Sequence, residues 1–205
     1  MKLYWSTRSP FVRKVMIAAH ETGLVRRIAL ERTIVAPTRP NAEVMALNPL
    51  NKLPTLVLDS GVVLYDSRVI VEYLDTLHDG VKLIPADGVA RFDALRLQAL
   101  SDGILDFLLL GLSERARPEA QQSPELKAAL AVKFRAGFDA IEAEASRLDP
   151  EHFRLPEIAV AAVIGYADFR YGPENWRHGR PALTDFAARI AERPSVVATA
   201  HADQY

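Results

Sequence analysis

The chain has 205 residues, enough for one large domain or two small ones. Apolar residues make up 49% of it and charged residues 25%, which is the balance of a globular protein. With 25 basic and 26 acidic residues, the net charge is −1, which argues against nucleic acid or a membrane surface as partner, because attraction to phosphate requires clustered excess cations. No apolar run reaches the roughly 18 residues needed to span a bilayer, and the N-terminus does not resemble a signal peptide, so we expect a cytoplasmic protein.

The absence of cysteine limits the chemistry further. Disulfides, thiolate metal sites and a cysteine nucleophile are excluded. The five histidines are scattered and lack the spacing of metal ligands, so we expect no metal.

The N-terminal residues predict a strand, a helix and a second strand. Residues 2–5 alternate as a short strand, and Ser9 is a good N-cap for a helix that begins at Pro10, where the missing N–H costs nothing. Gly23 is expected to end this helix, and residues 26–35 to form the second strand. A strand, a crossover helix and a strand imply a parallel pair.

The next stretch predicts a hairpin followed by a helix. A short helix is expected over 42–47, and residues 55–58 and 62–65 predict two strands joined by Asp-Ser-Gly, a hairpin turn. The following helix is expected to begin at Asp66 or Ser67, with apolar residues on one face.

A proline stands at the mouth of the third predicted strand. Pro54 lacks the N–H of a sheet ladder, so it belongs at a strand start or an edge. A cis Leu53–Pro54 bond would turn the N–H and C=O of Leu53 outward, where they could pair with an extended peptide. The sequence therefore predicts a loop that docks a small peptide.

The remainder of the chain is expected to be helical. Helices are predicted over 89–115, 125–148 and 181–192, with a short one after Pro194, and the helix over 156–169 is apolar all round and so should be buried. The last residues are expected to fray. The predicted organisation is a thioredoxin-like α/β domain (1–78), a linker (79–88) and an all-helical domain (89–205).

Four patches of sequence, in this order and spacing, resemble the cytosolic glutathione transferases over essentially the whole chain. They are 9–14, 48–56, 66–74 and 158–170. The Ser-Pro-Phe start is similar to tau-class and related bacterial enzymes, and to omega-type enzymes with serine in place of cysteine. The resemblance implies a homodimer that uses glutathione as co-substrate to conjugate a small, hydrophobic electrophile in detoxification.

The resemblance also implies that Ser9 faces the glutathione sulfur. A hydroxyl that donates to a thiolate lowers the thiol pKa, and a helix N-terminus acts in the same direction. Thr7 is a second hydroxyl that could take this role. The alternative is that Ser9 serves only as an N-cap.

Further residues correspond to the family's glutathione site. Leu53 would pair its backbone with the cysteinyl residue, Lys52 and Arg39 would face carboxylates, and Asp66 and Ser67 would hold the γ-glutamyl group at a helix N-terminus. The structural alternatives are a solvated lysine and ordinary helix caps. The implied glutathione-binding set is Ser9, Arg39, Lys52, Leu53, Pro54, Asp66 and Ser67.

The electrophile pocket is expected between Ser9 and the long helix over 89–115. An apolar residue on a helical stripe can equally be a core residue. The candidates are Phe11, Phe107, Leu108, Arg115 and Tyr166.

The buried helix over 156–169 departs from the family pattern at its start. The family usually has a hydroxyl cap there, where this chain has Arg154. Glu157 can still accept from the Arg154 N–H, and Phe153 and Ile158 could form a hydrophobic staple.

Two other functions compete with conjugation. A member of the family could keep the fold as a binding or regulatory protein without catalysis. A glutathione-dependent reductase would need the cysteine that this chain lacks, although a peroxidase side activity through the glutathione thiolate stays open.

Overall fold

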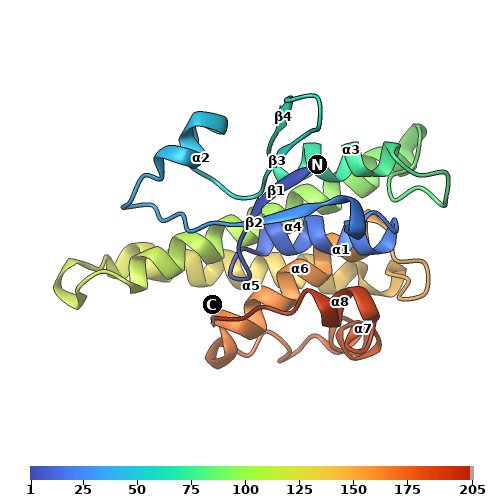
Figure 1. Ribbon diagram of the computed structural model, residues 1–205. Helices are drawn as coiled ribbons and strands as arrows, with labels where there is room; N and C mark the ends of the chain where they lie inside the picture. Colours follow the sequence, from blue (N-terminus) through green and yellow to red (C-terminus); the bar gives the residue numbers. More distant parts are fainter. Residues whose placement is uncertain (204–205) are drawn as a thin grey trace. The chain divides into compact units, whose positions relative to one another are not determined.

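The computed structural model describes residues 1–203, which fall into two compact units (Figure 1). Residues 1–86 and the segment from Pro194 form the first unit, and residues 87–193 form the second. The C-terminal segment therefore differs from the sequence prediction, which assigned it to the helical domain. The reason is that α8 (Pro194–Ala198) packs against α1 (Pro10–Glu21), a contact between residues far apart in the chain.

A four-stranded mixed sheet forms the first unit, in the order β2-β1-β3-β4. β1 pairs with β2 in parallel, as the strand–helix–strand pattern predicted, and β3 runs antiparallel to both β1 and β4. The second strand is shorter than expected: residues 25–27 form a 3-10 turn before it, and it ends at Arg32. The strands are β1 (Lys2–Trp5), β2 (Ala29–Arg32), β3 (Thr55–Val57) and β4 (Val63–Leu64).

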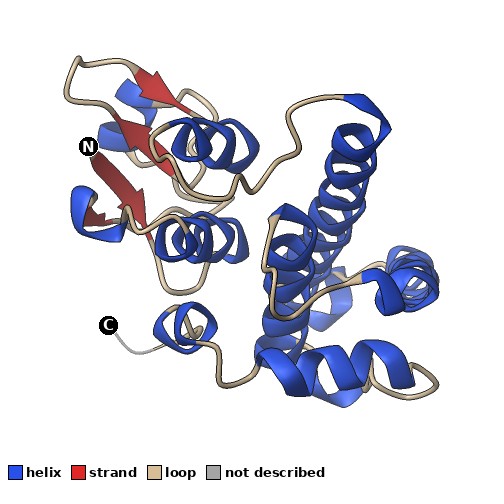
Figure 2. Cartoon of the chain, turned by 90° about the vertical axis from the view of Figure 1, so that its right-hand side faces the viewer, coloured by secondary structure: helices blue, strands red, loops and turns tan. Residues whose placement is uncertain are grey.

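Two helices of the first unit pack on each other through apolar faces. Within α1, Val15 and Ile17 are fully buried, and within α3 (Ser67–Thr76) Ile70 and Leu74 are fully buried. Figure 2 shows both helices almost end-on beside the strands. The short α2 (Ala42–Leu47) has the bounds that the sequence predicted.

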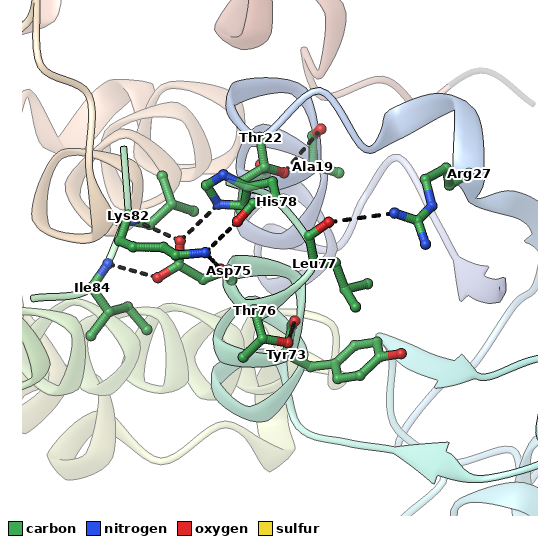
Figure 3. A network of polar contacts seen from close by, with 12 residues as sticks. Ala19, Thr22, Arg27, Tyr73, Asp75, Thr76, Leu77, His78, Lys82 and Ile84 are labelled. Atoms are coloured by element: carbon green, nitrogen blue, oxygen red, sulfur yellow. Dashed lines mark hydrogen bonds and ion pairs between the residues drawn. The ribbon is translucent and has the colours of Figure 1, made fainter. Parts of the chain in front are cut away.

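Residues that follow α3 are held to it by a buried carboxylate (Figure 3). Asp75 Oδ1 accepts from Leu83 N at 2.7 Å and from His78 Nε2 at 3.0 Å, and Oδ2 accepts from Ile84 N at 3.0 Å. Lys82 Nζ donates to the Asp75 carbonyl at 2.8 Å and also to the His78 carbonyl. Much of the segment predicted as a linker is therefore fixed to the first unit.

The second unit contains four α-helices, and α6 lies in its core. The burial of α6 (Leu155–Arg170) confirms the prediction drawn from its all-round apolarity. The others are α4 (Gly88–Arg115), α5 (Pro124–Glu144) and α7 (Pro181–Ile190). No helix within residues 1–203 is both long and apolar enough to cross a membrane.

The start of α6 is capped by a carboxylate, as predicted. Glu157 Oε2 accepts from Arg154 N at 3.0 Å, and Oε1 accepts from Asp149 N at 3.1 Å. Burial raises the pKa of Glu157, although these backbone bonds act in the opposite direction. Phe153 and Ile158, expected to form a staple, are both buried.

Gly137→Ala is expected to destabilise the second unit by up to about 2 kcal/mol. A Cβ at this α5 position would lie 2.6 Å from Ile104 Cγ1 and 2.9 Å from its Cδ1. Overpacking costs about 1–3 kcal/mol, while alanine gains about 1 kcal/mol in helix propensity. Gly103→Ala is the matched control, because its Cβ would meet nothing within 4 Å. Thermal unfolding should show a lower Tm only for the first variant, and equal shifts would contradict the close approach.

Candidate functional site

Strand directions bring the predicted site residues to one end of the sheet. Because β3 runs antiparallel to β1 and to β4, the chain leaves β1, enters β3 and leaves β4 at the same end. Ser9 follows β1, Leu53 precedes β3 and Ser67 follows β4. The loop that carries Arg39 follows β2, which runs parallel to β1, and so it also starts at this end.

Ser9 caps α1 and still has a hydrogen to donate. Its Oγ accepts from Val12 N at 3.2 Å, which uses an oxygen lone pair. The hydroxyl hydrogen has no acceptor within residues 1–203, and the residue is partly exposed. The capping role and the proposed catalytic role are therefore compatible, although the sequence presented them as alternatives.

The Thr7 hydroxyl is hydrogen-bonded to the C-terminal segment. Its Oγ1 donates to the Ala202 carbonyl at 2.9 Å, and its own carbonyl accepts from His201 Nδ1 at 2.8 Å. The one proton that Thr7 could give to a ligand is thus engaged in this structure. Fraying was expected for residues 201–205, but 201–203 are bonded to this loop, and 204–205 lie outside the described residues.

The Leu53 loop has free main-chain groups. The Leu53–Pro54 peptide is cis. Neither the N–H nor the carbonyl of Leu53 makes a hydrogen bond with the part of the chain that the structure describes, while its side chain is buried. Such groups can pair with an extended peptide.

The buried side chain of Asn48 holds this loop through hydrogen bonds. Its side-chain amide donates to the Lys52 carbonyl at 3.2 Å and to Thr55 Oγ1 at 3.0 Å, and its Oδ1 accepts from Leu50 N at 3.1 Å. Asn48 is only 1% exposed. This positioning role was not predicted, because Asn48-Pro49 signals a turn but not the partners of the Asn48 side chain.

Two basic side chains lie on connected loops. Asn51 Oδ1 accepts from Asn41 N at 3.0 Å, and its Nδ2 donates to the Arg39 carbonyl at 3.4 Å, which ties the loop of Arg39 to that of Lys52. Both Lys52 and Arg39 are exposed, and neither forms an ion pair with the described residues. They are available to an anionic ligand.

The first turn of α3 presents unused donors. Asp66 caps the helix by accepting from Arg68 N at 2.9 Å. Ser67 is 2% exposed, and neither its hydroxyl nor its backbone N–H has a partner among the residues described. A helix N-terminus with free N–H and hydroxyl groups favours a carboxylate, and Asp66 beside it favours an ammonium.

Three of the five electrophile candidates have structural roles in the second unit. Leu108 and Tyr166 are 2% and 1% exposed. The Leu108 carbonyl also accepts from the Tyr171 hydroxyl. Arg115 pairs with Glu174 and lies 4.2 Å from the Tyr171 ring centroid. These positions favour core packing for Leu108 and Tyr166.

The other two candidates are partly exposed aromatic residues. Phe11 lies in the first unit with Lys14 Nζ 6.0 Å from its ring centroid. Phe107 lies in the second unit with Lys133 Nζ 5.1 Å from its ring centroid. Both remain predictions as substrate contacts.

A thioredoxin-like unit with such a loop, combined with a helical unit built around a buried helix, defines the glutathione-transferase class of fold. The chain matches the family models described as glutathione S-transferase, N-terminal domain, over residues 8–77, and glutathione S-transferase, C-terminal domain, over residues 124–189. The chain belongs to the glutathione S-transferase family.

Individual relatives cover nearly the whole chain. A glutathione transferase family member from Pseudomonas fluorescens Pf-5, solved with bound glutathione, is 42% identical with a TM-score of 0.95, covering 98% of each chain. The "Uncharacterized GST-like protein YibF" of Escherichia coli K12 is 32% identical over 97% of this chain and 98% of its own. A "Stringent starvation protein A homolog" of Pasteurella multocida Pm70 is 27% identical over 90% of this chain and 86% of its own.

Proposed function

We propose that the protein is a glutathione transferase that conjugates the glutathione thiolate to a small, hydrophobic electrophile. The observation that carries this proposal is the uncommitted hydroxyl hydrogen of Ser9 at the start of α1. It lies at the sheet end where Leu53 and Ser67 also present unused donors.

The free groups at this end match glutathione part by part. Ser67 would donate to the γ-glutamyl carboxylate and Asp66 would accept from the ammonium. Leu53 would pair its main chain with the cysteinyl residue, as an added strand does. Lys52 and Arg39 would supply positive charge for the glycyl carboxylate. The relative from Pseudomonas fluorescens Pf-5 with bound glutathione supports this ligand.

Catalysis would consist of stabilising the thiolate. The Ser9 hydroxyl would donate to the sulfur, and the N-terminus of α1 would favour its negative charge, so both would lower the thiol pKa. The thiolate would then form a bond to the electrophilic carbon, and the leaving group would depart with its electron pair. The nucleophile belongs to the bound peptide, which suits a chain without cysteine.

The proposal also covers the oligomeric state, the cellular location and the class affiliation. The protein would form a homodimer, and exposed apolar residues from the hairpin turn to the first turn of α3 support a second copy: Val62, Tyr65 and Val69 are 53%, 36% and 46% exposed. We also propose a cytoplasmic, metal-independent role in detoxification. The Ser-Pro-Phe start supports a tau-like or omega-like affiliation.

The second candidate function is a regulatory or binding protein without catalysis. The similarity to a protein named as a stringent starvation protein A homolog favours it. A non-catalytic protein would not lower the pKa of a bound thiol, so the two functions are separable by experiment.

Calorimetric titration with glutathione tests the binding part of the proposal. We expect saturable binding, weakened roughly 10- to 100-fold by Ser67→Ala, because a hydrogen bond to a charged group contributes about 1.5–3 kcal/mol. Ser60→Ala, in the exposed hairpin turn, is the matched control and should bind as the unmodified protein does. Absence of saturable binding would reject the proposed function, and equal binding by the two variants would reject the assigned role of Ser67.

A further inference from the structure

A four-residue turn joins β1 to α1 and carries Ser9. Ser9 N donates to the Ser6 carbonyl at 3.2 Å, and Arg8 N donates to Ser6 Oγ at 3.3 Å. The position of the Ser9 hydroxyl relative to a bound ligand depends on how well this turn is held.

Residues 201–203 hold the middle of that turn; we call them the C-terminal clamp. His201 Nδ1 donates to the Thr7 carbonyl at 2.8 Å, and Thr7 Oγ1 donates to the Ala202 carbonyl at 2.9 Å. Arg8 Nη2 donates to the Asp203 carbonyl at 3.1 Å, and Arg8 Nε lies 3.1 Å from Asp203 Oδ1. Three consecutive clamp residues thus bond to the two residues directly before Ser9.

The clamp has its own anchor on the helix that Ser9 caps. Ser195 Oγ donates to Glu21 Oε1 at 2.5 Å, and Arg13 Nη2 donates to the Val196 carbonyl at 3.3 Å. Both bonds join α8 to α1, and Figure 1 shows α8 leading into the C-terminal segment. The clamp therefore fixes the turn relative to α1 itself, so Ser9 is located both by its cap and by the residues before it.

We propose that the C-terminal clamp sets the position of the Ser9 hydroxyl, with His201 as a positioning residue for the reaction. This inference rests on the proposed role of Ser9 as donor to the glutathione sulfur. His201 bonds to a backbone carbonyl and not to the hydroxyl, so it acts through the turn. Positioning matters because a shift of about 1 Å in a reacting geometry can cost up to about 100-fold in rate.

The chemistry of the bond between His201 and the Thr7 carbonyl indicates which residues at position 201 should preserve it. The Thr7 carbonyl accepts only, so residue 201 must place a hydrogen at the position of Nδ1. An asparagine amide nitrogen stands the same number of bonds from Cα as histidine Nδ1, whereas a glutamine amide nitrogen stands one bond further. His201→Asn should therefore keep the contact, and His201→Gln and His201→Ala should lose it.

The test compares these three variants in the full chain. The pH dependence of thiolate absorbance gives the pKa of bound glutathione, steady-state kinetics with an activated aryl chloride gives kcat, and calorimetry gives Kd. For His201→Ala and His201→Gln we expect a raised thiol pKa and a kcat lowered roughly tenfold, with Kd changed less than threefold. His201→Asn should keep the thiol pKa and the kcat of the unmodified protein. A general loss of stability on replacing His201 would not predict this difference between asparagine and glutamine.

Two outcomes separate failure of this inference from failure of the proposed function. If the unmodified protein lowers the thiol pKa and Ser9→Ala abolishes this effect, but His201→Ala leaves it intact, only the clamp is rejected. If the unmodified protein binds glutathione without lowering the thiol pKa, both are rejected. Should His201→Ala fail to fold, His201→Gln in the full chain should show the same rise in thiol pKa, and an unchanged pKa would overturn the inference.

Discussion

Ser9→Ala is expected to lower kcat for the proposed glutathione conjugation by about 10²- to 10³-fold and to raise the pKa of the bound thiol. Removing one preorganised donor to a reacting anion has an effect of this size in other enzymes. The hydroxyl hydrogen of Ser9 has no acceptor within residues 1–203, so it is available to the sulfur. Kinetics and thiolate absorbance as a function of pH measure the two effects.

Two further variants separate this role from helix capping. Ser9→Ala also removes the acceptor for Val12 N, which costs about 0.5–2 kcal/mol of stability, whereas glycine at an N-cap costs only a few tenths. Ser9→Gly should thus lose activity with little loss of stability, and Ser9→Thr should retain both. A fully active Ser9→Gly variant would show that Ser9 is only a cap.

Asp75→Ala is expected to destabilise the first unit by about 3–5 kcal/mol. Asp75 is 6% exposed, and its carboxylate satisfies the buried N–H groups of Leu83 and Ile84, as well as His78 Nε2. Each buried donor left unsatisfied costs about 1–3 kcal/mol. Urea unfolding should report this loss as a lower transition midpoint.

Neighbouring substitutions provide the controls for Asp75. Asp79→Ala removes an exposed carboxylate four residues away and should change stability by less than about 0.5 kcal/mol. Asp75→Asn keeps one acceptor oxygen and should lie between the two. A loss below about 1 kcal/mol for Asp75→Ala would mean that the segment after α3 does not depend on this carboxylate.

Local patterns predicted most of the elements. Ser9 and Asp66 were expected at helix starts, and both accept from backbone N–H groups there, because N-capping depends only on residues two or three positions away. The burial of α6 followed from its composition, since a helix without a polar face must lie in a core. Glu157 was expected to cap Arg154 for the same local reason.

Predictions failed or stayed open where the partners or the burial of a residue depend on residues far away in the chain. Thr7 looked like a second hydroxyl donor, but its proton is engaged by Ala202, nearly 200 residues later. The segment after α3 looked like a linker, but Asp75 binds it. Sequence periodicity could not distinguish core residues such as Leu108 and Tyr166 from pocket residues.

By itself the sequence determined the two-part fold and the family resemblance, and it predicted a loop at Leu53 that could dock a peptide, because caps, hydrophobic periods and turn residues act over short distances. Only the tertiary structure decided which hydroxyl keeps a free hydrogen and what holds it. Ser9 retains its hydrogen while Thr7 gives its own to the C-terminal clamp. Hydrogen-bond partners far apart in the chain leave no periodic signal, so their pairing emerges only when α8 packs against α1.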